Sequence, residues 1–221
     1  MIVTDHQSSF LPWTPYWHKV LHSDIHVATT GVRFDFGGHQ NRVKASHGWM
    51  TVNVDRKTKS GLIKDVEFNR PSLKKIARTI EMVYGAKANP YAYRVAPIIE
   101  KLEKNATNNL VALNETLRTT VLATLTGRPI QTILSEETSD RDTITGRLFD
   151  RLGKLDLPDE YDYLSGKGAS YLNLDAVPEH VGVLKQQLPH NEPDETILRV
   201  LVREPDPQDY IMARYSYERV K

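Results

Sequence analysis

The sequence predicts an α/β fold, in which helices flank a mostly parallel β-sheet. A chain of 221 residues is long enough for one domain with a substantial hydrophobic core. Its 39% hydrophobic and 26% charged residues are proportions typical of a globular protein. Short β-branched runs alternate with longer stretches of helical periodicity, the order that a parallel sheet requires. We therefore expect residues 1–221 to form a single α/β domain.

The first elements are predicted to be a strand, a helix and a second strand. Residues 2–4 are a short β-prone opening, and Pro12 and Pro15 precede a helix expected over residues 16–22. Alternating β-branched side chains predict the second strand over residues 24–30. This order favours parallel strands joined by a crossover helix.

A small β insertion and a helical segment are expected next. The insertion spans about residues 33–70, with strands at 50–54 and 62–68 joined by the polar turn 56–61 into a hairpin-like pair. About residues 71–127 are predicted to be helical. Their expected helices run over 71–84, 96–104 and 110–125, with Pro71 at the start of the first and Gly85 and Gly127 as stops.

In the last third of the chain, predicted strands again alternate with a predicted helix. A buried strand at 130–134, a helix at 142–155 and a strand at 161–164 are expected. A tail over about residues 189–221 is rich in Pro and Asp and holds a last predicted strand at 197–202. The whole pattern predicts a Rossmann-like sheet, in which ligands bind beyond the carboxyl ends of the strands.

Composition excludes several classes of protein. The chain has no cysteine, which removes disulfides, thiolate zinc sites, iron–sulfur clusters and a cysteine nucleophile. No apolar run is long enough to cross a membrane, and the first residues lack the pattern of a secretory signal. A cytoplasmic protein with no membrane partner is expected.

Charge is distributed unevenly along the chain. The formal net charge is only +1, but residues 33–104 hold 15 basic and 7 acidic side chains, a balance of +8. Residues 105–221 hold 13 basic and 19 acidic side chains, a balance of −6. The basic segment favours a polyanionic or phosphorylated partner. The alternative is that the two halves neutralise each other across the fold.

The N-terminal stretch is dense in chemically active side chains, and six of the eight histidines lie within the first 47 residues. His6 and Gln7 directly follow the first strand, where a ligand is expected in such a sheet. His18 and His22 are four residues apart on the predicted helix, a spacing that can hold a metal. Because neither an HExxH context nor a third carboxylate ligand is evident, a solvated helix face is the preferred interpretation and no metal site is predicted.

Two further segments have residues suited to anions. The loop 165–170, Ser-Gly-Lys-Gly-Ala-Ser, follows a predicted strand and offers backbone N–H groups and an ammonium, although its spacing is not that of a Walker A loop. Arg42, Lys44 and Trp49 interleave cations with an aromatic ring, which suits phosphates and stacked bases. A plain turn and a solvated basic loop are the alternatives. No Ser-His-Asp arrangement, GxSxG elbow or GxGxxG motif is found.

Two sequence blocks resemble the WbqC-like family. Residues 6–19, HQSSFLPWTPYWHK, resemble the family's opening of H-Q-P, an aromatic and L-P-W-x-G-Y, with Ser8 and Pro15 as departures. Residues 163–172, YLSGKGASYL, resemble its Y-L-S-G-x-G-A-x-x-Y-L. Shorter matches are N-R-x-K at 41–44, S-E at 135–136 and T-x-R-L at 145–148. The resemblance runs from about residue 3 to residue 188, and the tail lacks the family's closing pattern.

The resemblance implies an α/β fold and a transferase-like role in surface-polysaccharide assembly. Related bacteriophage proteins imply a second setting, thymidine hypermodification. There an amino acid such as glycine is attached to pyrophosphorylated 5-hydroxymethyluracil in DNA. In both settings an amine or hydroxyl displaces a phosphate-type leaving group. No cofactor is predicted, and assistance by a divalent cation such as Mg²⁺ is left open. The compartment would be the host cytoplasm for a phage-encoded chain.

Such a displacement needs a neutralised leaving group and a deprotonated nucleophile. His6 is the candidate general base, with Asp24 or Gln7 orienting it or the nucleophile. Lys19, Arg42, Lys44 and the loop 165–170 are candidates to neutralise the leaving group, Trp13 and Tyr16 to stack on a base or sugar, and Glu136 to recognise an amino group. The catalytic candidates are His6, Gln7, Lys19 and Asp24. The substrate-binding candidates are Trp13, Tyr16, Asn41, Arg42, Lys44, Glu136, Arg147, Ser165, Gly166, Lys167, Gly168, Ser170 and Tyr171.

Three functional hypotheses follow. The first, favoured by the basic segment, is a transferase with DNA and a free amino acid as partners. The second is a transferase acting on a nucleotide sugar, and the third is a non-catalytic nucleic-acid-binding module. A steep dependence of DNA binding on salt separates the first from the second. Loss of turnover in His6→Ala separates both enzymes from the binding module. The oligomeric state is not predicted.

Overall fold

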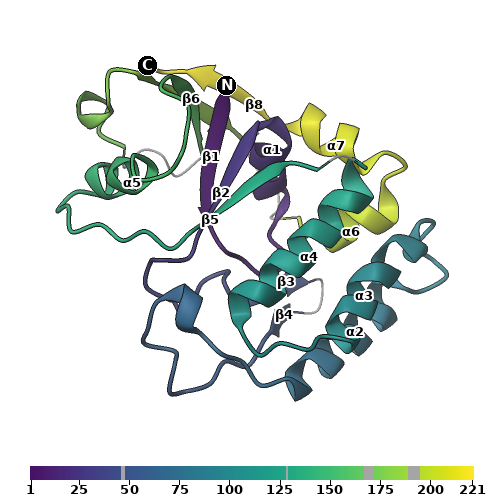
Figure 1. Ribbon diagram of the computed structural model, residues 1–221. Helices are drawn as coiled ribbons and strands as arrows, with labels where there is room; N and C mark the ends of the chain where they lie inside the picture. The colour runs from purple at the N-terminus through teal and green to yellow at the C-terminus, as the bar shows by residue number, and fades with distance from the viewer. Residues whose placement is uncertain (46–47, 128, 167–171, 189–194) are drawn as a thin grey trace.

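The computed structural model of this protein describes residues 1–45, 48–127, 129–166, 172–188 and 195–221, and within these ranges the main sheet has six strands (Figure 1). The strand order is β5-β2-β1-β6-β7-β8. Neighbouring strands are parallel, except that β8 is antiparallel to β7. The predicted mostly parallel α/β fold is therefore confirmed. The strands are β1 (Ile2–Gln7), β2 (Ile25–Thr29), β5 (Gln131–Ser135), β6 (Tyr161–Ser165), β7 (Val181–Gln187) and β8 (Ser216–Arg219).

The order of the strands reverses direction between β1 and β6. From β1 the chain passes through helix α1 (Thr14–His22) to β2 on one side, and β5 continues on that side. It then passes through helix α5 (Ile144–Leu152) to β6, which pairs with the opposite edge of β1. In an open α/β sheet, the crevice at such a reversal, beyond the carboxyl ends of the strands, is the usual ligand site.

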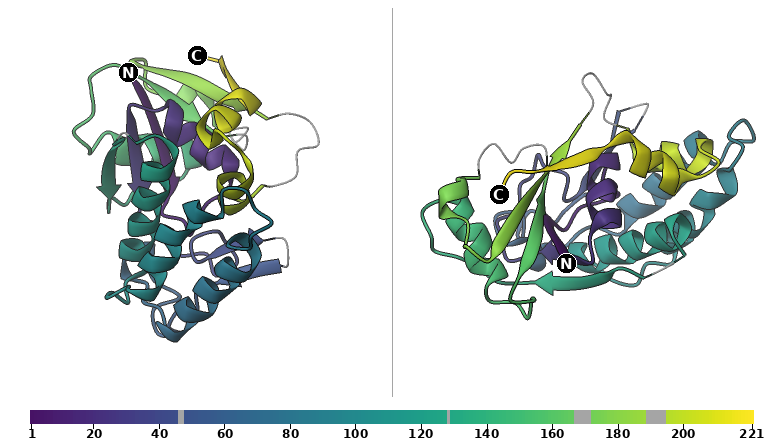
Figure 2. Two further views of the ribbon diagram at one scale, coloured as in Figure 1. Left: turned by 90° about the vertical axis from the view of Figure 1, so that its right-hand side faces the viewer. Right: turned by 90° about the horizontal axis from the view of Figure 1, so that it is seen from above.

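Helices cover both faces of the sheet. In Figures 1 and 2, α5 lies against one face, while α1 and α7 (Pro207–Arg214) lie against the other. Val3 belongs to the hydrophobic cluster under α5, which also contains Phe149 and Tyr163. Side chains alternate along a strand, so Val3 and His6 lie on opposite faces of β1. His6 faces the other way and contacts Tyr16 of α1. The two faces of β1 therefore present different chemistry at the same edge of the sheet.

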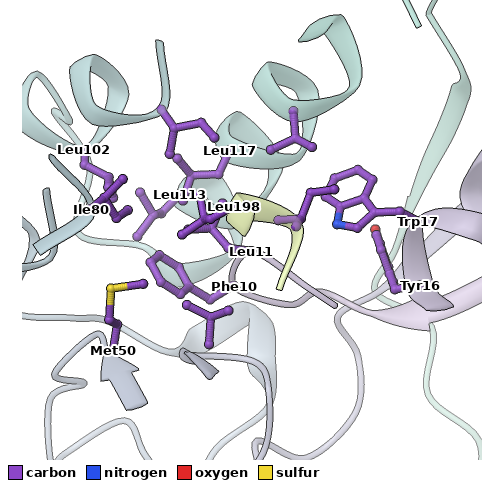
Figure 3. Close-up of a cluster of buried hydrophobic side chains, with 14 of the residues drawn as sticks. Phe10, Leu11, Tyr16, Trp17, Met50, Ile80, Leu102, Leu113, Leu117 and Leu198 are labelled. Atoms are coloured by element: carbon purple, nitrogen blue, oxygen red, sulfur yellow. The ribbon is translucent and has the colours of Figure 1, made fainter. Parts of the chain in front are cut away.

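A helical layer extends beyond the α1 face. It consists of α2 (Pro71–Tyr84), α3 (Ala96–Glu103), α4 (Leu110–Leu125) and α6 (Ile197–Arg203), and the first three match the predicted helices. Leu113, Leu117 and Leu198 pack there with Phe10 and Leu11, which come from the loop after β1 (Figure 3). Leu11 has a φ of 44°, an uncommon conformation for a non-glycine residue, at the turn that leads to Trp13. None of the helices in the described ranges combines the length and apolarity needed to span a membrane.

The hairpin in the basic insertion differs from the predicted one. It pairs β3 (Arg42–Ala45) with β4 (Gly48–Thr51) in antiparallel register, with Lys44 opposite Trp49. The expected strand at 62–68 is wrong, since a 3₁₀ helix, Ile63–Asp65, occupies its start. Ile63 and Val66 are both fully buried, and this spacing of three fits a helical turn.

The second half of the chain brings further corrections. The apolar run predicted as a strand at 197–202 is helix α6. Because nearly every side chain in that run is buried, the run lacks the alternation that separates strand from helix. The predicted strand at 130–134 is present as β5, but it lies at the edge of the sheet, where Leu134 is 53% exposed. Strands β7 and β8 and helix α7 were not predicted.

Candidate active site

A cleft of about 940 Å³ lies at the reversal point, beyond the carboxyl ends of β1 and β6. This is large enough for a small-molecule ligand or a nucleotide. Among the described residues, Asp5 is the one carboxylate that lines it. Its cationic lining residues are Lys19, Arg33, Arg147 and Arg151. The excess of cations over carboxylates makes the cleft suited to an anionic ligand.

His6 lines the cleft as a neutral imidazole. Its Nδ1 lies 2.8 Å from the carbonyl oxygen of Gln7. Because a carbonyl oxygen only accepts hydrogen bonds, Nδ1 carries the proton and Nε2 holds the lone pair. Burial, with the ammonium of Lys19 nearby, lowers the pKa of His6 to about 4. At neutral pH, Nε2 is therefore unprotonated.

Lys19 places an ammonium at the base of the cleft. The residue is 6% exposed, and its Nζ donates a 3.1 Å hydrogen bond to the backbone oxygen of Asp5. Burial lowers the pKa of Lys19, and the Asp5 carboxylate acts in the opposite direction. A Cβ placed on Gly166 would lie 3.8 Å from this Nζ, so Lys19 reaches the end of β6 as well as β1.

Asp5 is a site residue that sequence analysis missed. Its Oδ1 accepts a 2.5 Å hydrogen bond from the Tyr163 hydroxyl, and its Oδ2 accepts a 3.3 Å hydrogen bond from Thr29 Oγ1. These partners come from β6 and β2, the two neighbours of β1, so the carboxylate is held from both sides. Its position next to His6, at the end of the first strand, was the available signal.

Two arginines of α5, Arg147 and Arg151, line the cleft. Nη1 of Arg147 donates to the carbonyl oxygens of Arg141 and Asp142, at 3.2 and 3.0 Å, which holds its guanidinium in place. Arg151 lies one turn further along the helix and lines the same cleft. Arg33 enters from the loop after β2. The i, i+4 spacing from Arg147 could have indicated Arg151, whereas no local pattern marks Arg33.

Other predicted residues that line the cleft are Gln7, Trp13, Tyr16 and Gly166. The Oε1 of Gln7 accepts a hydrogen bond from Nε2 of Gln40. Tyr16 is buried, its hydroxyl lies 3.0 Å from Nε2 of His26, and its ring meets His6 edge-on. Tyr16 is thus buried in the floor of the cleft, a position that does not suit the expected stacking role. Trp13 is only partly buried, so its ring remains accessible for stacking.

Three predicted residues lie elsewhere. Asp24 accepts a 2.7 Å hydrogen bond from the backbone N–H of Ile2, at the opposite end of β1 from His6, so the expectation that it orients His6 is wrong. Glu136 forms a 3.0 Å ion pair with Lys64 and is not among the cleft residues. The buried hydroxyl of Ser165 donates to the backbone oxygen of Leu184, which is a structural role.

The predicted residues of the basic insertion lie beside the cleft, not in it. Asn41 is buried and donates to the Val52 carbonyl oxygen. Arg42 and Lys44 line a separate, smaller cavity. The predicted residues Lys167, Gly168, Ser170 and Tyr171 lie outside the residues that the structure describes.

The histidine pair on α1 is not a solvated helix face. His18 is buried, and its Nδ1 accepts a 2.8 Å hydrogen bond from Nε2 of Gln186 on β7. Burial against this strand is a tertiary property, which explains why the expectation of a solvated face was wrong for His18. Over the described ranges, no group of three or more histidine and carboxylate side chains is arranged to hold a metal ion.

Fold and cleft together define an α/β protein with a cation-lined cleft at the point where its strand order reverses. The model of the WbqC-like protein family matches residues 7–180, and the chain belongs to that family. The matched region runs from the end of β1 to the start of β7 and so includes most of the cleft. No curated protein and no solved structure matches the chain.

Proposed function

We propose that this chain is a transferase in which the amino group of a free amino acid, such as glycine, displaces pyrophosphate from an activated 5-hydroxymethyluracil in DNA. The C–N bond forms at the methylene carbon as the C–O bond to pyrophosphate breaks, and the electron pair leaves with pyrophosphate. The single observation that carries the proposal is that four cations and a neutral His6 line one cleft.

The cations serve the leaving group. Lys19, Arg147 and Arg151 approach the cleft from two elements, α1 and α5, and so can surround a pyrophosphate. Charge-assisted hydrogen bonds to phosphate oxygens are stronger than neutral ones, and cations that are already in place stabilise charge as it develops. The hydrogen bonds that hold Arg147 to two backbone carbonyls are this kind of preorganisation.

Asp5 and His6 serve the nucleophile. An amino acid at neutral pH carries an ammonium, which is not nucleophilic until it loses a proton. The Asp5 carboxylate binds this ammonium, and Nε2 of His6 takes the proton. The negative charge of bound pyrophosphate raises the pKa of His6 from its low value in the empty cleft, which makes it a better base once the substrate is present.

DNA is favoured as the acceptor by the basic insertion. Arg42 and Lys44 lie on the hairpin next to the cleft, in the segment of the chain with the positive charge balance. A nucleotide sugar is the second candidate acceptor, because the volume of the cleft falls within the range of pockets for small molecules. Clustered cations outside the cleft predict a steep loss of DNA affinity with salt, which a nucleotide sugar would not require.

Mass spectrometry on paired reactions tests the proposal. Purified protein receives a pool of amino acids, with and without Mg²⁺, and either DNA with pyrophosphorylated 5-hydroxymethyluracil or a panel of nucleotide sugars. An amino-acid mass increment on the nucleoside, absent with His6→Ala, is the expected result. An increment on a sugar instead would identify the second candidate. No increment on either, together with salt-sensitive DNA binding, would indicate the non-catalytic binding module.

A further inference from the structure

A second cavity of about 220 Å³ lies beside the cleft, and Trp13 lines both. It is formed where the N-terminal loop, the β3–β4 hairpin and the C-terminal segment meet. Trp13 forms an isolated antiparallel bridge with Thr196, and the N–H of Thr14 donates to the carbonyl oxygen of Glu195. Backbone contacts between segments so far apart in the sequence fix the walls of this cavity.

Three planar rings form a row along the cavity. The rings of Trp13 and His39 are parallel to within 3°, with centroids 6.0 Å apart. His39 in turn lies 5.7 Å from Trp49, at a tilt of 56°. Trp49 is 46% exposed, a large fraction for an indole. The row leads from the wall of the cleft to the basic hairpin.

Two residues that line the same cavity have buried polar atoms without a partner among the described residues. Nε of Arg42 and Oγ1 of Thr196 are buried, and neither has a hydrogen-bond partner in the part of the chain that the structure describes. Buried polar groups are usually paired, so unpaired atoms on two residues that line one cavity favour a polar ligand there. The guanidinium of Arg42 also lies 4.2 Å from the ring centre of Trp49, so charge and aromatic surface coincide.

We propose that this cavity is a subsite for a nucleobase whose phosphate extends toward the cleft. Base–aromatic stacking accepts any base, and cations beside the rings bind the attached phosphate. Trp13 and Trp49 supply the stacking surface, and Arg42 with Lys44 supplies the charge. The inference rests on the proposed function. Its ligand is either the base next to the reacting nucleotide in DNA or the base of a nucleotide sugar.

Tryptophan fluorescence gives a direct readout of this subsite. Of the three tryptophans in the chain, Trp13 and Trp49 line the cavity, while Trp17 is fully buried and donates to the Pro12 carbonyl oxygen. The protein is titrated with a tetrathymidylate, with UDP-glucose and with 2-deoxyribose 5-phosphate, which lacks a base. We expect quenching by a ligand with a base and none by the sugar phosphate.

Variants assign the signal to residues. Trp13→Ala and Trp49→Ala should each remove part of the quenching and weaken binding about 10-fold, the lower part of the range for one stacked base. Arg42→Gln should weaken binding and reduce its salt dependence. Phe36→Ala is the matched control, because Phe36 is an exposed aromatic beside Lys59 in the same insertion but outside the cavity. Thermal melting of each variant confirms that it is folded.

The outcomes separate the subsite from the reaction. Quenching by the oligonucleotide alone supports the DNA base, and quenching by UDP-glucose alone supports the base of a nucleotide sugar. Equal responses to ligands with and without a base, or no response to any, overturn the subsite. Base-dependent quenching without any amino-acid transfer retains the subsite and overturns the proposed reaction.

Discussion

The hydroxyl of Tyr163 donates a 2.5 Å hydrogen bond to Oδ1 of Asp5, and so connects β6 to β1 where the strand order reverses. Thr29 of β2 donates to the other carboxylate oxygen. Three adjacent strands therefore fix one negative charge in a cleft whose other charged lining residues, among those described, are cations. In the proposed reaction, this arrangement places an anionic contact for the nucleophile beside the cationic contacts for the leaving group.

Replacing Asp5 should impair the use of the amino acid. In Asp5→Asn the charge-assisted hydrogen bond to the donor's ammonium is lost, and we expect KM for the amino acid to rise about 10- to 100-fold. Tyr163→Phe retains the charge but loosens the carboxylate, so its KM should rise less, by about 10-fold or below. Initial rates over a range of amino-acid concentrations measure both. Asp175→Asn, at an exposed aspartate, is the control, and an unchanged KM in Asp5→Asn would contradict the assignment.

The pH dependence of turnover should report His6. The neutral imidazole is the active form and its pKa is about 4 in the free protein, so kcat/KM should fall only as the pH drops toward 4, not near 6.5. His6→Ala should lower kcat about 10²- to 10⁴-fold while pyrophosphate still binds.

A second variant tests the cause of this low pKa. The Lys19 ammonium helps to lower the pKa of His6, so Lys19→Met should move the acid limb of the profile to higher pH. The exposed Lys74→Met should leave the limb in place. An acid limb near pH 6.5 in the unmodified protein would mean that another group is the base.

The helical segment was predictable because its signals are local. Pro71 and Gly85 bound a helix whose buried residues recur at helical spacing, and the structure has this helix at the predicted bounds. The run at 197–202 was misassigned because its apolar side chains are nearly all buried and show no clear alternation to detect.

The site was predictable only in part. His6 and Gln7 lie at the carboxyl end of β1 and could be placed by a general rule of α/β sheets. The role of Asp5 depends on β6 being the neighbour of β1, a pairing between residues about 160 positions apart. Asp24 was misplaced for the related reason that closeness in sequence to His6 does not show which end of a strand a residue occupies.

The two arginines of α5 should bind the leaving group together. We expect Arg147→Gln and Arg151→Gln each to weaken the binding of inorganic pyrophosphate about 10-fold. Because both contact one ligand, their combined effect should depart from additivity. Isothermal titration calorimetry measures the affinities, with the exposed Lys74→Gln on α2 as the control. The same affinity in the two single variants, the Arg147→Gln/Arg151→Gln double variant and the unmodified protein would show that pyrophosphate binds elsewhere.

His18 should make the stability of the protein depend on pH. Burial, together with the adjacent His22, lowers the pKa of His18 to about 3, whereas in the unfolded chain it is near 6.5. Between these values the unfolded state binds a proton that the folded state does not, so the free energy of unfolding falls as the pH falls. One such group contributes a slope of about 1.4 kcal/mol per pH unit.

Urea unfolding of His18→Gln at pH 4, 5, 6 and 7 isolates this contribution. The variant retains a side chain that can accept the hydrogen bond from Gln186, yet it has no imidazole to protonate. Its stability should therefore decline less steeply below pH 6 than that of the unmodified protein, by up to about 1.4 kcal/mol per pH unit. His180→Gln, at an exposed histidine, serves as the control. Equal slopes of unfolding free energy against pH in His18→Gln and the unmodified protein would show that His18 is not a source of acid sensitivity. Another buried histidine, with His26 as the first candidate, would then have to account for any loss of stability at low pH.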